Sequence, residues 1–109
     1  MAPAEVRIAP DDLRTLVARI FAAAGAPADI AAEVADHLVL SNLSGHDSHG
    51  VIRVPWYVEH IQTGLLDPRA RARIVKETEA SALVSGEWGF GHPAARLAMD
   101  QAVDRAKRR

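Results

Sequence analysis

Two stretches with helical spacing of apolar residues, separated only by Gly25-Ala26-Pro27, constrain the fold more than any other feature of the sequence. The first begins at Pro10, which is followed by two aspartates that favour a helix start. Its apolar face comprises Leu13, Leu16, Val17, Ile20, Phe21 and Ala24. The second runs to about Leu43 with apolar Ile30, Ala31, Val34, Ala35, Leu38 and Val39. Because the connection is so short, with Gly25 as a left-handed terminator, the two helices should form a hairpin.

The pattern changes twice after this hairpin. A third helix is expected from Val51 to Gln62, ending at Gly64, with Pro55 either kinking it or restarting it after a first turn. Beyond Pro68, β-type segments around Ala72, Ile74 and Val75 and at residues 81–85 predict a short β-hairpin connected through Glu77-Thr78-Glu79.

A last helix is expected to begin at Pro93. Its predicted apolar face comprises Ala95, Ala98, Met99, Ala102, Val103 and Ala106. Residues 1–9 show no periodicity and are expected to be a loose arm or a short edge strand. The predicted class is therefore α+β: three helices, a short β-hairpin and a C-terminal helix.

Charge and cysteine content exclude several functions. A formal net charge of -1 gives no field that would hold a nucleic-acid backbone or an anionic membrane. No apolar run approaches the roughly 18 residues of a membrane-spanning helix, and the first residues do not resemble a signal peptide. Because the chain has no cysteine, disulfides, thiolate metal sites and thiol nucleophiles are excluded. We therefore expect a cytoplasmic protein.

The segment SGHDSHGVIRVPWY, residues 44–57, carries the densest chemistry. If the backbone is helical from His49 onward, then His49, Arg53 and Tyr57 line one face at i, i+4 and i+8. Histidine suits proton transfer near neutral pH, arginine binds a carboxylate with two hydrogen bonds, and tyrosine adds a hydroxyl donor. This combination indicates a site for a small carboxylic acid. In the structural alternative, the histidine caps or packs and the arginine extends into solvent.

Three other readings concern neighbouring residues. A divalent metal site would use His46, Asp47, His49 and His60, although their spacing matches no familiar pattern. Ser48 and His49 are not expected to form a nucleophilic dyad, because adjacent side chains point in different directions. The glycine-rich run 86–91 precedes a helix, where an anion can bind, but a plain loop is favoured. Three aromatic residues are expected to pack, with an interface as the alternative for the last two: Trp56, Trp88 and Phe90.

The stretch DSHGVIRVPWY, residues 47–57, resembles the signature of the malate/L-lactate dehydrogenase family, which includes ureidoglycolate and sulfolactate dehydrogenases and diketogulonate reductases. The run VSGEWGFG, residues 84–91, followed by Ala98-Met99, resembles that family's strand, glycine loop and helix. The resemblance implies a larger, non-Rossmann oxidoreductase fold that uses NAD or NADP. It places the proton donor and acceptor at His49 and the lining of the substrate site at Ser48, Arg53 and Tyr57, with Arg53 as the carboxylate partner.

At 109 residues the chain is much shorter than members of that family. We therefore expect residues 10–109 to be part of an N-terminal domain without the nucleotide-binding core. The implied substrate is a small 2-hydroxy or 2-oxo acid such as malate or lactate, the implied assembly a homodimer, and the chain alone should be inactive. Apolar surface intended for missing structure should remain exposed. The alternative is a truncated or stand-alone helical interaction module without catalysis.

Overall fold

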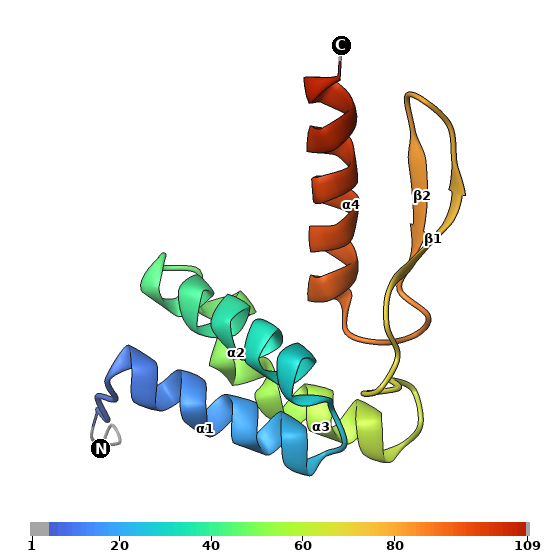
Figure 1. Ribbon diagram of the computed structural model, residues 1–109. Helices are drawn as coiled ribbons and strands as arrows, with labels where there is room; N and C mark the ends of the chain where they lie inside the picture. The colour runs from blue at the N-terminus through green and yellow to red at the C-terminus, as the bar shows by residue number, and fades with distance from the viewer. Residues whose placement is uncertain (1–4, 109) are drawn as a thin grey trace.

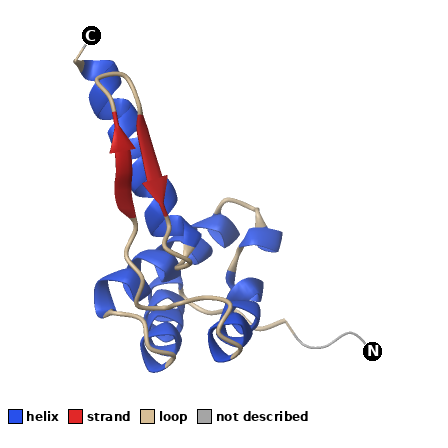
Figure 2. Ribbon diagram, turned by 90° about the vertical axis from the view of Figure 1, so that its right-hand side faces the viewer, coloured by secondary structure: helices blue, strands red, loops and turns tan. Residues whose placement is uncertain are grey.

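The computed structural model describes residues 5–108, in which a helical base carries a projecting arm (Figure 1). The base consists of α1 (Pro10–Ala23), α2 (Ala28–Leu43) and α3 (Val54–Gln62). The arm consists of a hairpin of β1 (Arg73–Glu77) and β2 (Ala82–Ser85) lying alongside α4 (Gly91–Lys107), as both ribbon views show (Figure 2). The radius of gyration, 16.0 Å, exceeds the roughly 13 Å of a compact domain of this length because the arm extends away from the base.

The predicted helical hairpin is confirmed. Gly25 adopts a φ of 111°, and the Ala26 amide donates to the Phe21 carbonyl at 3.0 Å, which closes α1 in the way glycine-terminated helices commonly end. All six predicted apolar residues of α2 are buried, and α1 buries Val17 and Phe21 against them. Leu16, which was predicted to belong to the apolar face of α1, is instead 49% exposed. The two helices therefore form most of the core.

The third helix follows the restart alternative rather than a continuous helix. Residues Asp47–His49 and Val51–Arg53 each form one 3-10 turn, separated by extended backbone at Gly50, and α3 begins only at Val54 with Pro55 in its first turn. The proline lacks an amide hydrogen, so the first turn of a helix is the place that accepts it.

The β-hairpin is also present, with strands close to the predicted positions. The strands pair antiparallel from Arg73 opposite Ser85 to Glu77 opposite Ala82, with an irregularity between Ile74 and Lys76. The connection lies at residues 78–81, since Glu77 belongs to β1. Residues 1–9 were predicted to be a loose N-terminal arm or a short edge strand. Of these, residues 5–9 are exposed and have no regular structure, and residues 1–4 lie outside the described part.

The predicted apolar face of the last helix is wrong as a core face. Met99 is 64% exposed and Val103 43% exposed, because α4 turns a different side toward the hairpin. On that side Arg105 is buried, where it donates hydrogen bonds to the Thr78 carbonyl and to the Gln101 side chain and pairs with the Glu77 carboxylate. These bonds allow a charged residue to take the place that periodicity assigns to an apolar one.

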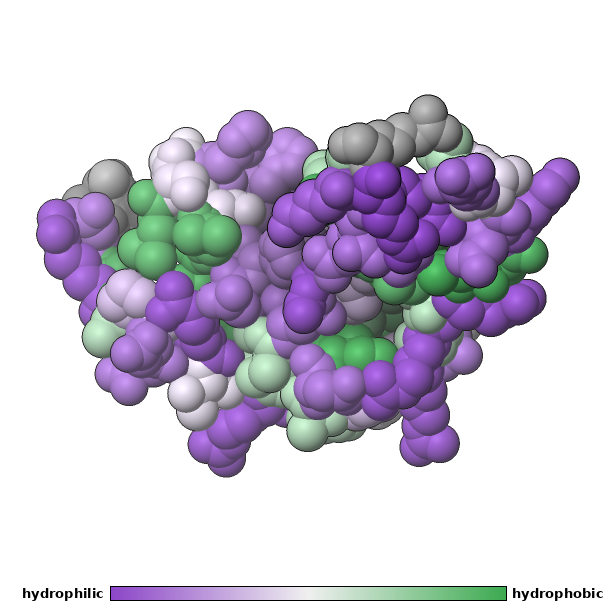
Figure 3. Space-filling model, turned by 45° about the horizontal axis from the view of Figure 1, so that its top comes forward, coloured by the Kyte–Doolittle hydropathy of each residue, from purple (hydrophilic) through white to green (hydrophobic). Residues whose placement is uncertain are grey.

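Exposed apolar side chains are present as expected. They form separate patches between hydrophilic surface (Figure 3). The most exposed large examples are Val6, Ile52, Leu65, Trp88 and Met99. Trp88, predicted to pack, is 86% exposed, whereas Phe90 is buried in the core as predicted. Within residues 5–108, no helix has both the length and the apolar character required to cross a membrane.

Candidate active site

The segment that carries the candidate site is held in place by Asn42. After α2, Gly45 takes a φ of 78° and turns the chain into the first 3-10 turn. The Asn42 side chain then donates to an Asp47 carboxylate oxygen at 2.8 Å and accepts from the Val51 amide at 2.9 Å. A Cβ atom on Gly50 would lie under 3.0 Å from the same amide group. Glycine at this position therefore lets Asn42 bracket the turn that bears Ser48 and His49.

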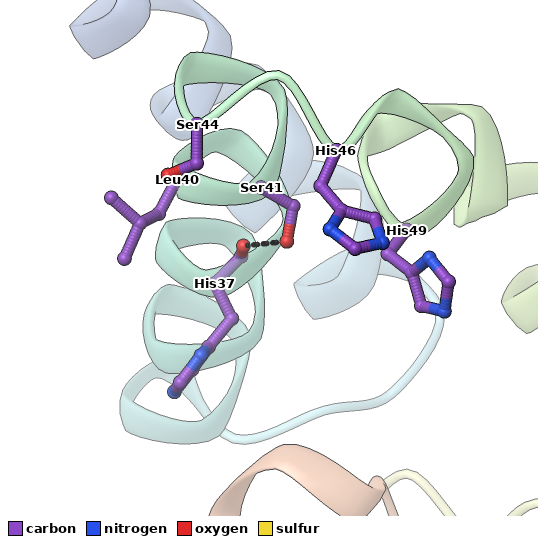
Figure 4. A pocket seen from close by; sticks show the side chains of 6 residues that line it. All are labelled: His37, Leu40, Ser41, Ser44, His46 and His49. Atoms are coloured by element: carbon purple, nitrogen blue, oxygen red, sulfur yellow. Dashed lines mark hydrogen bonds between the residues drawn. The ribbon is translucent and has the colours of Figure 1, made fainter.

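Ser48 and His49 form a hydrogen bond, contrary to the expectation that neighbouring side chains diverge. The Ser48 Oγ and His49 Nδ1 atoms are 2.9 Å apart. Both residues belong to the 3-10 turn Asp47–His49. His49 also contacts His46 edge to face, with ring centroids 4.7 Å apart (Figure 4).

Arg53 is oriented by two contacts. Its Nε donates to the Ser48 carbonyl at 2.8 Å, and its guanidinium carbon lies 6.0 Å from the centroid of the Trp56 ring. The two terminal nitrogens have no hydrogen-bond partner among residues 5–108. They remain free to bind a carboxylate in the two-bond geometry that arginine favours.

Tyr57 connects the site to the core. Its ring packs against Phe21 and Phe90, with centroids 6.1 and 5.7 Å away. Burial raises the pKa of the Tyr57 hydroxyl, and the positive charge of Arg53 opposes part of that increase. The hydroxyl therefore stays protonated near neutral pH and can donate a hydrogen bond.

The continuous helix that would have stacked these side chains at i, i+4 and i+8 does not form, because Gly50 interrupts it. His49, Arg53 and Tyr57 nevertheless line a single cavity of about 360 Å³. The three predicted residues thus lie together, although two 3-10 turns and α3, rather than one continuous helix, carry them. Trp56, predicted to pack, lines the same cavity and is 47% exposed.

Two histidines that the sequence analysis missed complete this cavity. His37 extends from α2 and His92 from the first turn of α4, with ring centroids 5.4 Å apart. Burial and the neighbouring His37 lower the pKa of His92, while Glu33 acts in the opposite direction. The available signal for His37 was its i, i+4 spacing to Ser41, which also lines the cavity. Nothing in the local pattern pointed to His92.

A second hollow adjoins the first. It has a volume of about 380 Å³ and shares His37, Ser41 and His49 with the cavity that Arg53 lines. His46 lines this hollow beside His49, and the Ser41 hydroxyl donates to the His37 carbonyl at 3.0 Å (Figure 4). The His49 ring therefore stands where the two hollows meet.

The alternative metal set is not assembled. His60 makes a 2.7 Å hydrogen bond from Nδ1 to the Trp56 carbonyl, and its ring contacts the indole of Trp56 at a tilt of 45°. The Asp47 carboxylate accepts a hydrogen bond from the Asn42 side chain. In the part of the chain that the structure describes, no three histidine, aspartate or glutamate side chains gather closely enough to hold a metal ion. The glycine-rich run forms a loop in which Glu87 and Trp88 have positive φ angles, 54° and 63°.

Comparison with known proteins agrees with this fold and segment. A family model described as malate/L-lactate dehydrogenase matches residues 8–109. The malate dehydrogenase of Pyrococcus abyssi is 37% identical over 103 residues, which cover 94% of this chain and 28% of that protein. Hydroxycarboxylate dehydrogenase B of Escherichia coli is 37% identical over 94 residues, which cover 86% of this chain and 26% of that protein.

The solved structure of a putative malate/lactate dehydrogenase from Escherichia coli superimposes with a TM-score of 0.89 at 35% identity. The match covers 95% of this chain and 29% of that one. The chain thus spans less than a third of the length of the curated relatives it matches. Because the family model matches almost the whole sequence, the chain belongs to the malate/L-lactate dehydrogenase family.

Proposed function

We propose that this chain forms the substrate-binding and proton-transfer part of an NAD- or NADP-dependent oxidoreductase that acts on a 2-hydroxy or 2-oxo acid such as malate or lactate. The observation that carries the proposal is the shared cavity, which joins a histidine, a guanidinium with free terminal nitrogens and a protonated phenol. Its volume, about 360 Å³, falls in the range of sites for small ligands. The names of the matching dehydrogenases support the same substrate class.

Arg53 would bind the carboxylate of the acid. Its Nε bond to the Ser48 carbonyl fixes the plane of the guanidinium, and the Trp56 ring supports its face. A carboxylate held by both terminal nitrogens has a fixed orientation, which places C2 at a defined distance from His49. The Tyr57 hydroxyl, in the same lining, would donate a further hydrogen bond to the acid.

His49 would move the proton of the C2 oxygen. When Nδ1 donates its hydrogen to the Ser48 hydroxyl, Nε2 presents a lone pair that can accept the proton of a 2-hydroxy acid as its carbonyl forms. In the opposite direction, the imidazolium returns that proton to the oxygen of the 2-oxo acid. The Ser48 hydroxyl can accept a hydrogen bond from Nδ1 of both the neutral ring and the imidazolium. Ser48 therefore positions the His49 ring in both protonation states.

The cavity fits the acid rather than a dinucleotide. It is small, and Arg53, Tyr57 and His49 supply polar groups for a carboxylate and a C2 oxygen. We assign no cofactor contact to residues 5–108, so those contacts would come from a nucleotide-binding core outside residues 10–109. NAD or NADP, when bound, accepts the hydride from C2 or donates it. We also propose that the exposed apolar side chains of α4, Met99 and Val103, contact that core or the second subunit of a homodimer.

A chimera tests the proposal. Residues 8–109 would replace the matching segment of hydroxycarboxylate dehydrogenase B from Escherichia coli, and oxidation of NADH or NADPH by 2-oxo acids would be followed. His49→Gln should lower kcat about 100-fold or more, because the general acid is lost. Arg53→Leu should raise KM about tenfold or more. The matched control His60→Gln, which changes a histidine outside the cavity, should stay within about threefold.

Two results would contradict the proposal. One is unchanged turnover in His49→Gln. The other is a folded chimera that binds cofactor but turns over no 2-oxo acid, which would favour the non-catalytic interaction module. The 109-residue chain alone should show no turnover, and measurable reduction of pyruvate or oxaloacetate by it would refute the assignment of the cofactor site to another part of the protein.

A further inference from the structure

One imidazole of the cavity has an unusual environment. The Nδ1 atom of His92 is buried and has no hydrogen-bond partner within residues 5–108. The same ring lines the cavity together with Arg53 and Tyr57. Because Nδ1 is enclosed, Nε2 is the ring nitrogen that can reach a bound molecule.

The surroundings of His92 keep it neutral. A proton on Nδ1 would bury an N–H donor without an acceptor, which is unfavourable. Burial and the adjacent His37 lower its pKa. Glu33 would favour the charged form, but its carboxylate is paired with Arg96 at 2.7 Å. A neutral ring with a bare Nδ1 carries its hydrogen on Nε2, so His92 is a hydrogen-bond donor to the cavity.

A series of contacts within the cavity lining runs from Arg53 to His92. The guanidinium of Arg53 lies over Trp56, and the Trp56 ring contacts Tyr57 with centroids 5.2 Å apart. Tyr57 in turn contacts His92 at 6.0 Å, and His37 lies beyond at 5.4 Å from His92. Trp56 and Tyr57 therefore link Arg53 to His92 in this series of contacts, and all four residues line the same cavity.

From these contacts we infer that His92, supported by His37, forms a specificity site that donates a hydrogen bond from Nε2 to an oxygen on the C3 substituent of the substrate. The inference rests on the proposed function, because it places the C1 carboxylate at Arg53 and the C2 oxygen at His49. It selects substrates whose C3 bears an acidic oxygen group, as in malate, over those that end in a methyl group, as in lactate. A hydrogen bond to a charged group corresponds to about a tenfold or greater difference in affinity.

The test uses the isotopically labelled 109-residue chain and its imidazole and guanidinium NMR signals. The chain would be titrated with L-malate and with L-lactate. We expect malate to shift the His92 signals and to bind about tenfold more tightly than lactate. His92→Leu, which removes the donor, should reduce that preference to about twofold or less. His92→Gln keeps an N–H donor and should retain most of it.

Three outcomes would overturn the inference: a preference for malate that persists in His92→Leu, an equal loss of affinity for both acids in that variant, or no response of the His92 signals to either acid. Failure of the proposed function has a different signature, since it would leave Arg53 and His49 unresponsive to lactate. A response of Arg53 and His49 to both acids without a preference for malate refutes the role of His92 alone.

Discussion

Substitution of Gly50 by alanine tests how the turn that carries His49 is held. The added methyl group would lie under 3.0 Å from the Asn42 amide, so that side chain must move away. It would lose its bonds to Asp47 at 2.8 Å and to the Val51 amide at 2.9 Å. At about 0.5–1.5 kcal/mol for each bond, Gly50→Ala should lower the free energy of unfolding by about 1–3 kcal/mol.

The double-mutant cycle with Asn42→Ala separates this collision from other effects of the methyl group. Asn42→Ala alone removes the same two bonds and should cost about 1–3 kcal/mol. Once the amide is gone, Gly50→Ala has nothing to displace, so the double variant should be nearly as stable as Asn42→Ala. The coupling free energy is then about 1–3 kcal/mol. Gly91→Ala is the matched control, because a methyl group there meets no atom within 4 Å.

Urea unfolding of the 109-residue chain, followed by circular dichroism at 222 nm, measures these differences. Equal destabilisation by Gly50→Ala in the presence and absence of the Asn42 amide would refute the reasoning. A cost for Gly91→Ala as large as that for Gly50→Ala would also refute it, because a methyl group that meets no atom would then cost as much as one that collides with Asn42.

Three further predictions use the same unfolding assay. Phe90→Ala should cost about 3–5 kcal/mol because the ring is buried between other aromatic side chains, whereas Trp88→Ala should stay within about 0.5 kcal/mol; equal costs would contradict this. Because the pKa of His92 is lowered in the folded chain, the unfolded chain binds a proton at this histidine first as pH falls through 6.5. The free energy of unfolding should therefore decline below that pH, and more in the original chain than in His92→Gln. Arg105→Met should cost about 1–3 kcal/mol by leaving Gln101 and the Thr78 carbonyl without their donor, and an unchanged midpoint would argue against that network.

Much of the base of the molecule could be predicted from the sequence. The α2 face was read correctly because six apolar residues at helical spacing have only one way to be buried together. Gly25 marked a helix end, and Pro55 marked a kink or a restart, for reasons of backbone geometry alone; the structure has the restart. These features depend on residues close in sequence, for which local rules suffice.

The arm was harder to predict. Periodicity assigned the core side of α4 to alanines and Met99, yet the helix turns Arg105 inward. That choice depends on acceptors supplied by the hairpin turn and Gln101, and the relation of the hairpin to α4 is not encoded in the spacing of apolar residues. Trp88 was expected to pack, with an interface as the alternative; it lies in a loop with positive φ angles and is exposed to solvent.

The candidate site also combines a part that local sequence predicts with a part that depends on tertiary contacts. Its central segment was found because a histidine, an arginine and a tyrosine occur within nine residues, although the helix that was to align them is interrupted at Gly50. His92 lies more than forty residues away from His49 and reaches the cavity only through the packing of α4 against α2. Tertiary contacts of this kind leave no local signal, so sequence patterns alone could not assign it.

The most direct test of the central claim, that His49 transfers the proton, is the pH dependence of both reaction directions in the chimera. Reduction of a 2-oxo acid needs a protonated ring and should slow as pH rises, whereas oxidation of the hydroxy acid needs the neutral ring and should slow as pH falls. His49→Gln should abolish the opposite pH dependences of the two directions and remove most of the rate. The same pH dependence in both directions, or an opposition that persists in His49→Gln, would contradict the claim.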